Sequence, residues 1–329
     1  MPTVEELKIL QALPLELKVA KTNARIREFV EHFGEENISV SFSGGKDSTV
    51  LLHLVRQIYP NIKAVFVNTG LEYPEIQSFV KTFDNVEIIR PQMRFDQVIK
   101  EYGYPFISKE IANVIYNARK GSQSAIDSLK GNKTHGDKKS IYNYEKYEPL
   151  LYVDFDISAN CCGIMKKKPL KQQKTANIVG TTTEESRLRK TAWLKTGCNS
   201  FKNAKSVPLS FWTCQDILKY IKDNGIKIAS VYGEIVENNK TKCLECTGCQ
   251  MTGCIFCGFG AHLDTLNGGD PRFLRLKHTH PKQYDYCMGG GEYNESGVWQ
   301  PNKDGLGMAH CIDILNKLYY KKYNNFIDY

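Results

Sequence analysis

Two hydrophobic periodicities alternate along the first ninety residues of the chain. Apolar positions at helical spacing run from Leu15 to Phe33 and stop at Gly34, which predicts a helix that ends at a glycine. Short β-rich runs and segments with helical spacing then follow one another: strands at 37–42, 62–68 and 86–89, helices at 49–58 and 74–83. Strands and helices in this rhythm predict a parallel sheet with right-handed crossovers.

The pattern becomes less regular in the second half. Residues 120–147 are rich in Lys, Asn, Ser and Gly and predict a loop or an insertion. A further strand is expected at 177–182, and a helix capped by Thr213 at 213–224. Beyond Lys240 the composition shifts to Cys, Gly and Thr, which indicates a unit that is not built around an apolar core. We therefore expect three parts: an N-terminal helical segment (1–36), a nucleotide-binding domain (37–239) and a Cys-rich subdomain with a C-terminal tail (240–329).

Composition and charge narrow the class of protein. With 329 residues, 41% of them hydrophobic and 24% charged, the chain is expected to fold around a substantial core. A formal charge of +8 favours polyanionic partners without choosing among them. The acidic N-terminus does not resemble a signal peptide, and no apolar run reaches the roughly 18 residues that a spanning helix needs. We expect a cytoplasmic protein without a membrane partner, in which eleven cysteines indicate metal or redox chemistry rather than disulfides.

The segment Ser43-Gly44-Gly45-Lys46-Asp47-Ser48 lies between a predicted strand and a predicted helix. Glycines let the backbone approach a phosphate closely, and a helix N-terminus supplies N–H groups and partial positive charge. Lys46 and the serine hydroxyls add further donors. The spacing is not that of a Walker loop. The segment therefore predicts a phosphate-binding loop of another kind.

This loop resembles the PP-loop of the ATP pyrophosphatase superfamily, whose members cleave ATP between its α- and β-phosphates. Three further segments are similar to the phosphoadenosine phosphosulfate (PAPS) reductase family: Asn68-Thr69-Gly70-Leu71-Glu72-Tyr73-Pro74-Glu75, Gly180 to Arg189 with Glu185-Ser186-Arg187, and Val207 to Ile217 with Trp212, Thr213 and Asp216. The resemblance implies an α/β, adenine nucleotide alpha hydrolase-like domain that binds ATP with Mg²⁺. It implies that Ser43 to Ser48, Thr69, Gly180 and Glu185 contact the nucleotide, with Lys46, Asp47, Arg187 and Arg189 catalytic. Thr182 stands where the family usually has Arg, so an anion contact made there in relatives is in doubt.

The cysteines form two groups in the sequence. Cys161-Cys162 precedes a basic stretch, and Cys243, Cys246, Cys249, Cys254 and Cys257 lie within fifteen residues. Cys-x-x-Cys spacing places two thiolates on one ion, and four such ligands suit either Zn²⁺ or an iron–sulfur cluster. Cys198, Cys214, Cys287 and Cys311 stand alone and are most simply explained as buried small hydrophobic residues.

The choice between zinc and iron rests on resemblance. Adenosine 5′-phosphosulfate reductases carry a Cys-Cys pair and a later Gly-Cys-x-x-Cys that together hold a [4Fe-4S] cluster. Cys161-Cys162 and Cys254-x-x-Cys257 match that order, about ninety residues apart. The resemblance thus implies a [4Fe-4S] cluster on Cys162, Cys254 and Cys257, with Cys161 and Cys249 competing for the fourth position. Zn²⁺ remains the alternative, and Cys243 and Cys246 are left for a second metal, a persulfide or a redox pair.

These features lead to one leading hypothesis and two alternatives. The first is an ATP-dependent iron–sulfur sulfurtransferase that adenylates its substrate and releases pyrophosphate. Its leading acceptor is a nucleic acid (tRNA or DNA), and a cysteine desulfurase or a thiol reductant is a further candidate partner. The basic residues Lys166, Lys167, Lys168, Arg187 and Arg189 would then be an anion-binding rim rather than an exposed charge run. The alternatives are a sulfonucleotide reductase and a non-catalytic nucleotide-sensing component. The intact PP-loop favours the first, because assimilatory reductases often lack it.

Overall fold

The computed structural model describes residues 2–264, 270–320 and 325–329. The chain divides into two compact units, each assembled from segments that are distant in the sequence. Unit 1 comprises 1–68, 72–90 and 169–253, and unit 2 comprises 69–71, 91–168 and 254–329. These bounds differ from the predicted ranges 1–36, 37–239 and 240–329. The N-terminal helices belong to unit 1, and the cysteine-rich region is divided between the two units.

Unit 1 is built on a six-stranded sheet in the order β3-β2-β1-β7-β9-β8. All its neighbours are parallel except the β8–β9 pair. The strands are β1 (Ile38–Ser41), β2 (Ala64–Val67), β3 (Val86–Ile89), β7 (Ala176–Val179), β8 (Asn199–Ser200) and β9 (Lys205–Ser206). The helices are α1 (Val4–Ala12), α2 (Leu15–Phe33), α3 (Lys46–Ile58), α4 (Pro74–Val80), α10 (Arg187–Thr196) and α11 (Cys214–Asp223). This arrangement confirms the predicted α/β class with a parallel central sheet.

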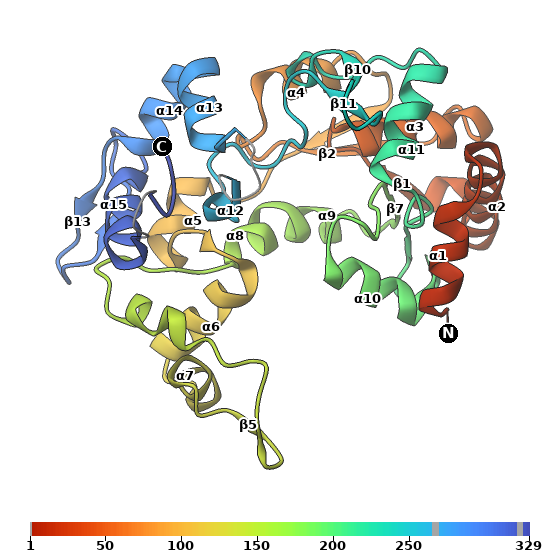
Figure 1. The fold of residues 1–329 in the computed structure, drawn as a ribbon. Helices are drawn as coiled ribbons and strands as arrows, with labels where there is room; N and C mark the ends of the chain where they lie inside the picture. The colour runs from red at the N-terminus through yellow and green to blue at the C-terminus, as the bar shows by residue number, and fades with distance from the viewer. Residues whose placement is uncertain (1, 265–269, 321–324) are drawn as a thin grey trace. The chain divides into compact units, whose positions relative to one another are not determined.

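The core of unit 1 explains why the N-terminal helices belong to it. Helices α2 and α11 both pack on α3 (Figure 1). The buried Lys18 of α2 forms an ion pair of 2.5 Å with Asp216 of α11, and the indole of Trp212 donates to Thr22 Oγ1 at 2.9 Å. Thr213 caps α11, as its sequence predicts, by accepting a hydrogen bond from Asp216 N. These contacts tie α2 to a segment almost two hundred residues away in the sequence.

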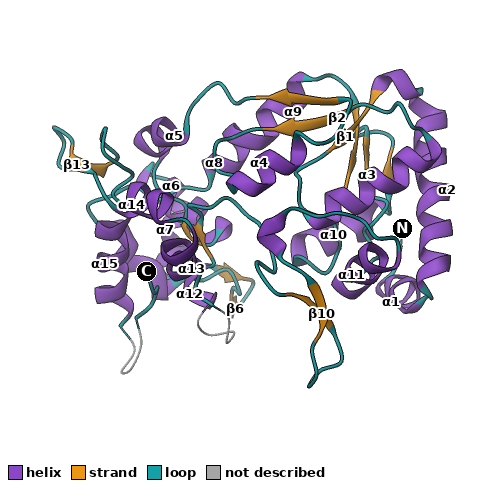
Figure 2. Ribbon diagram, turned by 90° about the horizontal axis from the view of Figure 1, so that it is seen from above, coloured by secondary structure: helices purple, strands orange, loops and turns teal. Residues whose placement is uncertain are grey.

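A small antiparallel hairpin completes unit 1. It consists of β10 (Ile235–Glu237) and β11 (Leu244–Cys246) and lies apart from the main sheet (Figure 2). The hairpin is preceded by a 3-10 turn at Ser230–Tyr232. The first part of the cysteine-rich region is therefore a continuation of unit 1.

Unit 2 is mainly helical. Its helices are α5 (Phe95–Tyr102), α6 (Lys109–Arg119), α7 (Gln123–Lys130), α8 (Asn160–Cys162), α12 (Ala261–Asp264), α13 (Arg272–Thr279), α14 (Pro281–Met288) and α15 (Met308–Tyr319). Its paired strands are β4 (Phe106–Ile107) with β12 (Gly258–Phe259), β5 (Thr134–His135) with β6 (Lys138–Lys139), and β13 (Glu292–Tyr293) with β14 (Trp299–Gln300). A 3-10 turn covers Glu145–Leu151, and a π-helical turn, Gly163–Lys167, follows α8. The next helix, α9 (Lys168–Gln172), lies almost entirely in unit 1, which begins again at Pro169.

The prediction of an irregular segment at 120–147 is wrong in part. That segment contains α7 and the β5–β6 hairpin. Ala125 and Leu129, four residues apart, are buried on the side of α7 that packs on α6. Two apolar residues among many Lys, Gly and Ser residues are too few to predict this helix from the sequence.

Candidate active site

The phosphate loop follows β1 and leads directly into α3. Gly44 has φ +71°, and a Cβ there would come within 2.8 Å of side-chain atoms of Ile76 and Val80, so glycine is required on both counts. Helix α3 has no side-chain cap at Gly45. Ser48 Oγ accepts from Ser43 N at 3.2 Å and donates to Gly45 O at 2.9 Å, which fixes the turn. A phosphate at this position would meet the N-terminus of a thirteen-residue helix.

Lys46 is the principal cation of the loop. Its side chain is largely buried, and its Nζ lies 3.6 Å from Asp47 Oδ2 and 3.2 Å from Gln250 O, to which it donates. Burial lowers the pKa of Lys46, but the charges of Asp47, Cys214, Tyr232 and Cys246 outweigh burial and raise it above its ordinary value. The ammonium group is therefore charged at neutral pH and suited to an anionic ligand.

Residues 232–252 pack beside the phosphate loop. The sequence did not predict this contact. The hydroxyl of Tyr232 accepts from Lys46 N at 3.3 Å and lies 2.6 Å from Thr252 Oγ1. A Cβ on Gly45 would lie 3.2 Å from the Tyr232 hydroxyl. No local signal in the sequence marks Tyr232, Gln250 or Thr252, because their role depends on the return of this segment to unit 1.

Two cysteines lie within electrostatic reach of Lys46. The charge of Lys46 favours the thiolate at Cys214 and Cys246, although partial desolvation of the two sulfur atoms outweighs it and raises the pKa of both thiols. Cys214 is exposed at the start of α11 and Cys198 is half-buried, so the expectation of buried packing cysteines is wrong for both. It is confirmed for Cys287 and Cys311, which are fully buried.

The loop after β7 is packed against the phosphate loop through Gly180. A Cβ at Gly180 would lie 2.9 Å from Asp47 O and 3.1 Å from Ser48 Cα, so the two backbones touch. Since β1 and β7 are neighbours and the chain order reverses between them, both loops lie at the switch point of the sheet, where α/β proteins bind ligands.

The acidic and basic residues after Gly180 organise the start of α10. Glu185 Oε1 accepts from Thr182 N at 3.0 Å and also pairs with Arg189. Arg187 is exposed on the first turn of α10. Thr69 belongs to unit 2, where its Oγ1 accepts from Leu71 N at 3.2 Å. The structure thus groups Ser43 to Ser48 with Gly180, while Thr69 is part of the other unit.

Four of the five predicted metal-ligating cysteines belong to unit 2. Cys161 and Cys162 lie on α8, and Cys254 and Cys257 enclose a turn in which Cys257 N donates to Cys254 O at 3.1 Å. The charges of Cys162, Cys257 and Cys254 all act on Cys161, so the four sulfur atoms share one neighbourhood. Cys249 belongs to unit 1, where its thiol donates to Met251 O at 3.0 Å.

The electrostatics of this cysteine group favour a thiolate at Cys162. A hydrogen bond from Cys161 is the largest cause. Burial opposes it, but the hydrogen bond and the charges of Lys109 and Lys166 together lower the pKa of Cys162 well below its ordinary value. The same contact raises the pKa of Cys161. Cys162 and Lys109 also line a cavity of about 480 Å³ in unit 2. No sequence motif predicts that Lys109 lies beside Cys162.

Arg272 holds the Cys257 turn in place. Its Nη1 donates to Cys257 O at 3.1 Å and to Phe259 O at 2.9 Å, while its Nε pairs with Asp264 at 2.6 Å. β12, which follows Cys257, pairs with β4, and Gly258 there leaves room for the ring of Phe106. Among the described residues, no three Cys, His, Asp or Glu side chains already converge in a metal-binding arrangement. The four thiols nevertheless fit a sulfur-only site in their chemistry.

Comparison with known proteins identifies the family. The model of the phosphoadenosine phosphosulfate reductase domain matches residues 37–107 and 109–258. The chain belongs to this family. The family assignment confirms the resemblance that the phosphate loop and the segments around residues 68–75 and 180–189 had indicated.

Several curated relatives are reductases. The adenosine 5′-phosphosulfate reductase of Staphylococcus epidermidis is 26% identical over 223 residues, which are 65% of this chain and 71% of that protein. The corresponding reductase of Bacillus cereus is 25% identical over 190 residues, 57% of this chain and 64% of that protein. These relatives are enzymes, in agreement with the expectation that this chain is one.

Two solved structures are also similar. A PAPS reductase from Candida auris, in a phosphate complex, gives a TM-score of 0.35 at 14% identity and covers 70% of this chain and 91% of its own. The U34-tRNA thiolase NcsA from Methanococcus maripaludis, with its [4Fe-4S] cluster, gives 0.30 at 14% identity and covers 83% and 77%. In the described part of this chain, no helix combines the length and apolarity needed to cross a membrane.

Proposed function

We propose that this protein is an ATP-dependent iron–sulfur sulfurtransferase of the PAPS reductase family, which activates its acceptor by adenylation and releases pyrophosphate. The observation that carries the proposal is the complete phosphate loop: Gly44 in its required conformation, an α3 N-terminus that begins at a glycine with no capping side chain, and a charged Lys46. A reductase that receives an already activated sulfonucleotide does not need to cleave ATP. A loop built to hold pyrophosphate favours a reaction in which the chain makes the activated intermediate itself.

Each residue of the loop has a definite task in that reaction. The backbone N–H groups at the start of α3 and Lys46 would bind the phosphates that leave as pyrophosphate and neutralise the charge that develops on them. Asp47 would hold Mg²⁺, which supplies further positive charge to the phosphates when bound. Gly180 lets the loop after β7 approach, so that the acceptor oxygen can be presented near the α-phosphate at the switch point.

The cysteines of unit 2 would hold the [4Fe-4S] cluster. We assign Cys161, Cys162, Cys254 and Cys257, because these four share one unit whereas Cys249 belongs to the other. When bound, the cluster would supply a site that accepts and passes on sulfur. Lys109 stabilises the thiolate form of Cys162 that a cluster ligand requires.

Cys214 and Cys246 have a separate role in this proposal. Both lie within electrostatic reach of Lys46 and so belong to the phosphate-loop side. They are candidates to carry sulfur as a persulfide that a cysteine desulfurase supplies. A nucleic acid, tRNA or DNA, is the leading acceptor, in keeping with the formal charge of +8.

Sulfonucleotide reduction is the second candidate. The family match and the reductase relatives favour it. In that reaction the phosphate loop would bind the nucleotide part of adenosine phosphosulfate. A thiolate would attack the sulfate sulfur and displace AMP, and a second thiol would then release sulfite as the two thiols are oxidised to a disulfide. ATP would then be unnecessary.

The deciding experiment uses the full-length protein purified anaerobically, with iron, acid-labile sulfide and zinc quantified. The protein is incubated with α-labelled ATP and candidate acceptors, and pyrophosphate is measured. Acceptor-dependent pyrophosphate release supports the proposal. Sulfite formed from a sulfonucleotide without ATP would establish the reductase, and tight nucleotide binding without turnover would favour a nucleotide-sensing component. Stoichiometric zinc without iron would rule out the cluster.

A further inference from the structure

Residues 131–146 of unit 2 form an exposed basic element, which we call the basic hairpin. It consists of the β5–β6 pair and the segments on either side, and it extends beyond α7 (Figure 1). It contains four lysines and one histidine against two acidic residues, so its net charge is positive. All six residues of β5, β6 and the turn between them are exposed. These side chains therefore contribute nothing to the core of unit 2 and can meet a partner.

The strand pairing places three basic side chains on one face of the basic hairpin. His135 lies directly opposite Lys138, so the two share a face. Lys133 precedes His135 by two residues, and Ser140 N donates to Lys133 O at 2.9 Å, so the pairing continues past β5. Because side chains two residues apart on a strand lie on the same side, Lys133 shares the face of His135 and Lys138.

Two of these side chains carry positive charge that no carboxylate compensates. Lys139 lies on the opposite face and pairs with Glu145 at 2.8 Å. Within the described ranges, neither Lys133 nor Lys138 forms an ion pair. Asp137, in the turn, is the acidic residue nearest to them in the sequence and is itself exposed. The face that carries Lys133 and Lys138 therefore attracts anions.

Exposed apolar side chains adjoin the lysines. Ile141 is 77% exposed and Tyr142 is 52% exposed. Their segment is fixed to the strand that carries Lys133: Asn143 Oδ1 accepts from Lys133 N at 3.0 Å, and Asn143 Nδ2 donates to Lys133 O at 2.9 Å. Ser128 of α7 donates to Tyr142 O. An exposed phenol ring on a backbone held in this way can stack on a nucleic-acid base.

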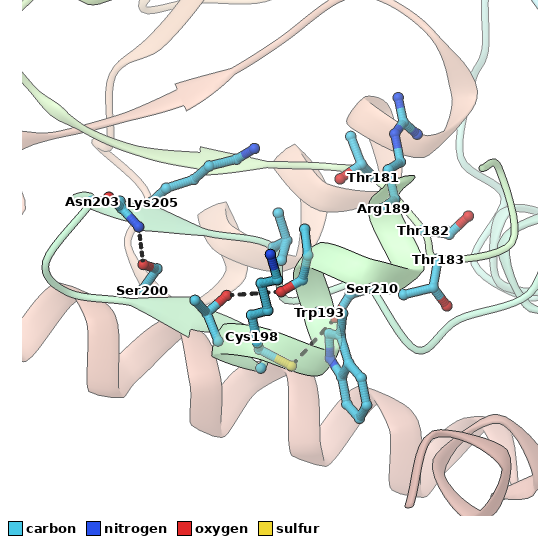
Figure 3. A pocket seen from close by; sticks show the side chains of 15 residues that line it. Thr181, Thr182, Thr183, Arg189, Trp193, Cys198, Ser200, Asn203, Lys205 and Ser210 are labelled. Atoms are coloured by element: carbon cyan, nitrogen blue, oxygen red, sulfur yellow. Dashed lines mark hydrogen bonds between the residues drawn. The ribbon is translucent and has the colours of Figure 1, made fainter. Parts of the chain in front are cut away.

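The basic hairpin is an open surface and not a cavity. In unit 1, a cavity of about 250 Å³ lies between α10 and the β8–β9 hairpin, next to the loop after Gly180 (Figure 3). In unit 2, the cavity of about 480 Å³ lies beside Cys162. No residue of the basic hairpin lines either one. Because small ligands bind in concave sites whereas a phosphate backbone binds to open basic surfaces, this face fits a polymer.

Lysines beside an exposed aromatic ring favour a nucleic acid over other polyanions. A membrane surface calls for a broad apolar face, and two apolar side chains do not supply one. A fully paired duplex keeps its bases stacked inside and offers none to Tyr142. RNA is recognised chiefly at unpaired loops, where splayed bases stack on aromatic side chains. The chemistry of this face thus fits an unpaired loop of RNA.

We propose that the basic hairpin binds an unpaired loop of RNA, with Lys133 and Lys138 on its phosphates and Tyr142 stacked on one of its bases. The inference rests on the proposed function in one respect, because it assigns a docking surface to the nucleic-acid acceptor. Binding itself requires neither ATP nor sulfur transfer and is measured without them.

Fluorescence anisotropy with the full-length protein tests the proposal. The probes are a labelled RNA stem-loop, a fully paired RNA duplex of the same length and a DNA stem-loop of the same sequence, each titrated without ATP. We expect the RNA stem-loop to bind about tenfold or more tightly than the duplex, because only the loop offers a base for stacking. The DNA stem-loop should bind more weakly than the RNA stem-loop, because it lacks the 2′-hydroxyl groups.

Matched variants separate the two kinds of contact. Replacing Lys133 and Lys138 together by Gln should weaken binding by about tenfold. It should also reduce the slope of log Kd against log salt concentration by about 1.4, since each phosphate contact on a single strand contributes about 0.7. Tyr142→Ala should weaken binding by about fivefold or more and leave that slope unchanged. Lys100→Gln combined with Lys303→Gln, at exposed lysines of unit 2 outside the hairpin, is the charge control and should bind like the wild type.

Several results would overturn the proposal. Absence of binding to the RNA stem-loop would do so outright, and equal binding of stem-loop and duplex would exclude the stacked base. A DNA stem-loop that binds as tightly as the RNA one would remove the assignment to RNA. An unchanged salt slope in the double lysine variant, or equal weakening by the control pair, would show that the phosphates do not lie on this face.

Pyrophosphate release is measured separately, so that the two proposals fail independently. RNA-dependent pyrophosphate release together with normal RNA binding by the hairpin variants would reject the surface and leave the proposed function standing. RNA binding that depends on the basic hairpin, without pyrophosphate release, would leave the surface standing and reject the proposed function.

Discussion

The phosphate loop of unit 1 and the cysteine group of unit 2 each contain a lysine beside the groups to which we assign chemistry, but they are assembled in different ways. The phosphate loop consists of six consecutive residues that run from the end of β1 into the first turn of α3. The cysteine group combines α8 with a turn about ninety residues later, which the β4–β12 pair and Arg272 hold in place.

The two lysines also act differently. Lys46 remains charged beside Asp47 and Gln250 O, whereas Lys109 acts on Cys162 and stabilises its thiolate. A contiguous loop needs only local geometry to work. The cysteine group comes from two distant segments and depends on the tertiary fold that brings them together. A substitution that disrupts the cysteine group should therefore leave the phosphate loop intact. The following predictions test this independence.

The largest effect is expected from single replacements of the unit 2 cysteines. Cys162→Ser, Cys254→Ser and Cys257→Ser should each lose essentially all bound iron, because a serine hydroxyl is a poor cluster ligand. Iron and acid-labile sulfide in anaerobic preparations measure this. Cys243→Ser, an exposed cysteine of unit 1, is the control and should retain iron. Loss of iron in Cys249→Ser but not in Cys161→Ser would reverse our assignment of the fourth ligand.

Lys46→Ala should reduce the rate of pyrophosphate release by about 100-fold or more, since it removes a charge-neutralising donor from the leaving group. Its iron content should equal that of the wild type. Lys81→Ala, at an exposed lysine of the same unit, should keep the wild-type rate. An iron-depleted Lys46→Ala protein would contradict the independence of the two sites.

A pair of glycine substitutions makes a sharper comparison. Gly180→Ala places a methyl group 2.9 Å from Asp47 O, so the phosphate loop must shift, and we expect ATP affinity to fall by about tenfold. Gly163→Ala, beside Cys162, meets no atom within 4 Å and has helical φ, so it should raise the free energy of unfolding by about 0.5–1 kcal/mol. Nucleotide titration and chemical denaturation measure the two effects. Unchanged ATP affinity in Gly180→Ala would show that the packing at this glycine is not needed.

The smallest effect is expected from Arg272→Lys. Lysine keeps the charge near Asp264 but cannot reproduce the fork that reaches both Cys257 O and Phe259 O. We expect a few-fold faster loss of iron to a chelator, with ATP turnover unchanged. The absorbance of the cluster over time gives the rate. Arg275→Lys, on the next turn of α13, serves as the control.

The sequence predicted best those features that depend on residues close together along the chain. The helix Leu15–Phe33 and the strand Val86–Ile89 were placed at the bounds observed, because a continuous apolar stripe and a β-rich run leave little choice. The phosphate loop was recognisable for the same reason. The sequence did not reveal that Tyr232 and Gln250 line this loop, nor that Lys109 lies beside Cys162, because these contacts arise when distant segments pack together.

The predicted domain bounds and the two structural units do not coincide, for a related reason. The change in composition near Lys240 is real, but it does not coincide with a structural boundary: β11, Cys246 and Cys249 belong to unit 1, and unit 2 begins again at Cys254. Composition describes which residues are present, whereas unit membership depends on what each segment packs against.

The hydrogen bond from Lys46 Nζ to Gln250 O has a consequence for how the protein would respond to its ligand. A phosphate that binds the Lys46 ammonium competes with this carbonyl for its donors, so nucleotide occupancy and the anchoring of the segment that carries Cys246 and Cys249 are linked equilibria. Nucleotide should therefore speed amide hydrogen exchange between Cys246 and Thr252, even though nucleotide binding usually slows exchange around its own site. The buried thiols of Cys246 and Cys249 would then be more accessible in molecules already loaded with nucleotide, which favours an order in the encounter with a sulfur donor.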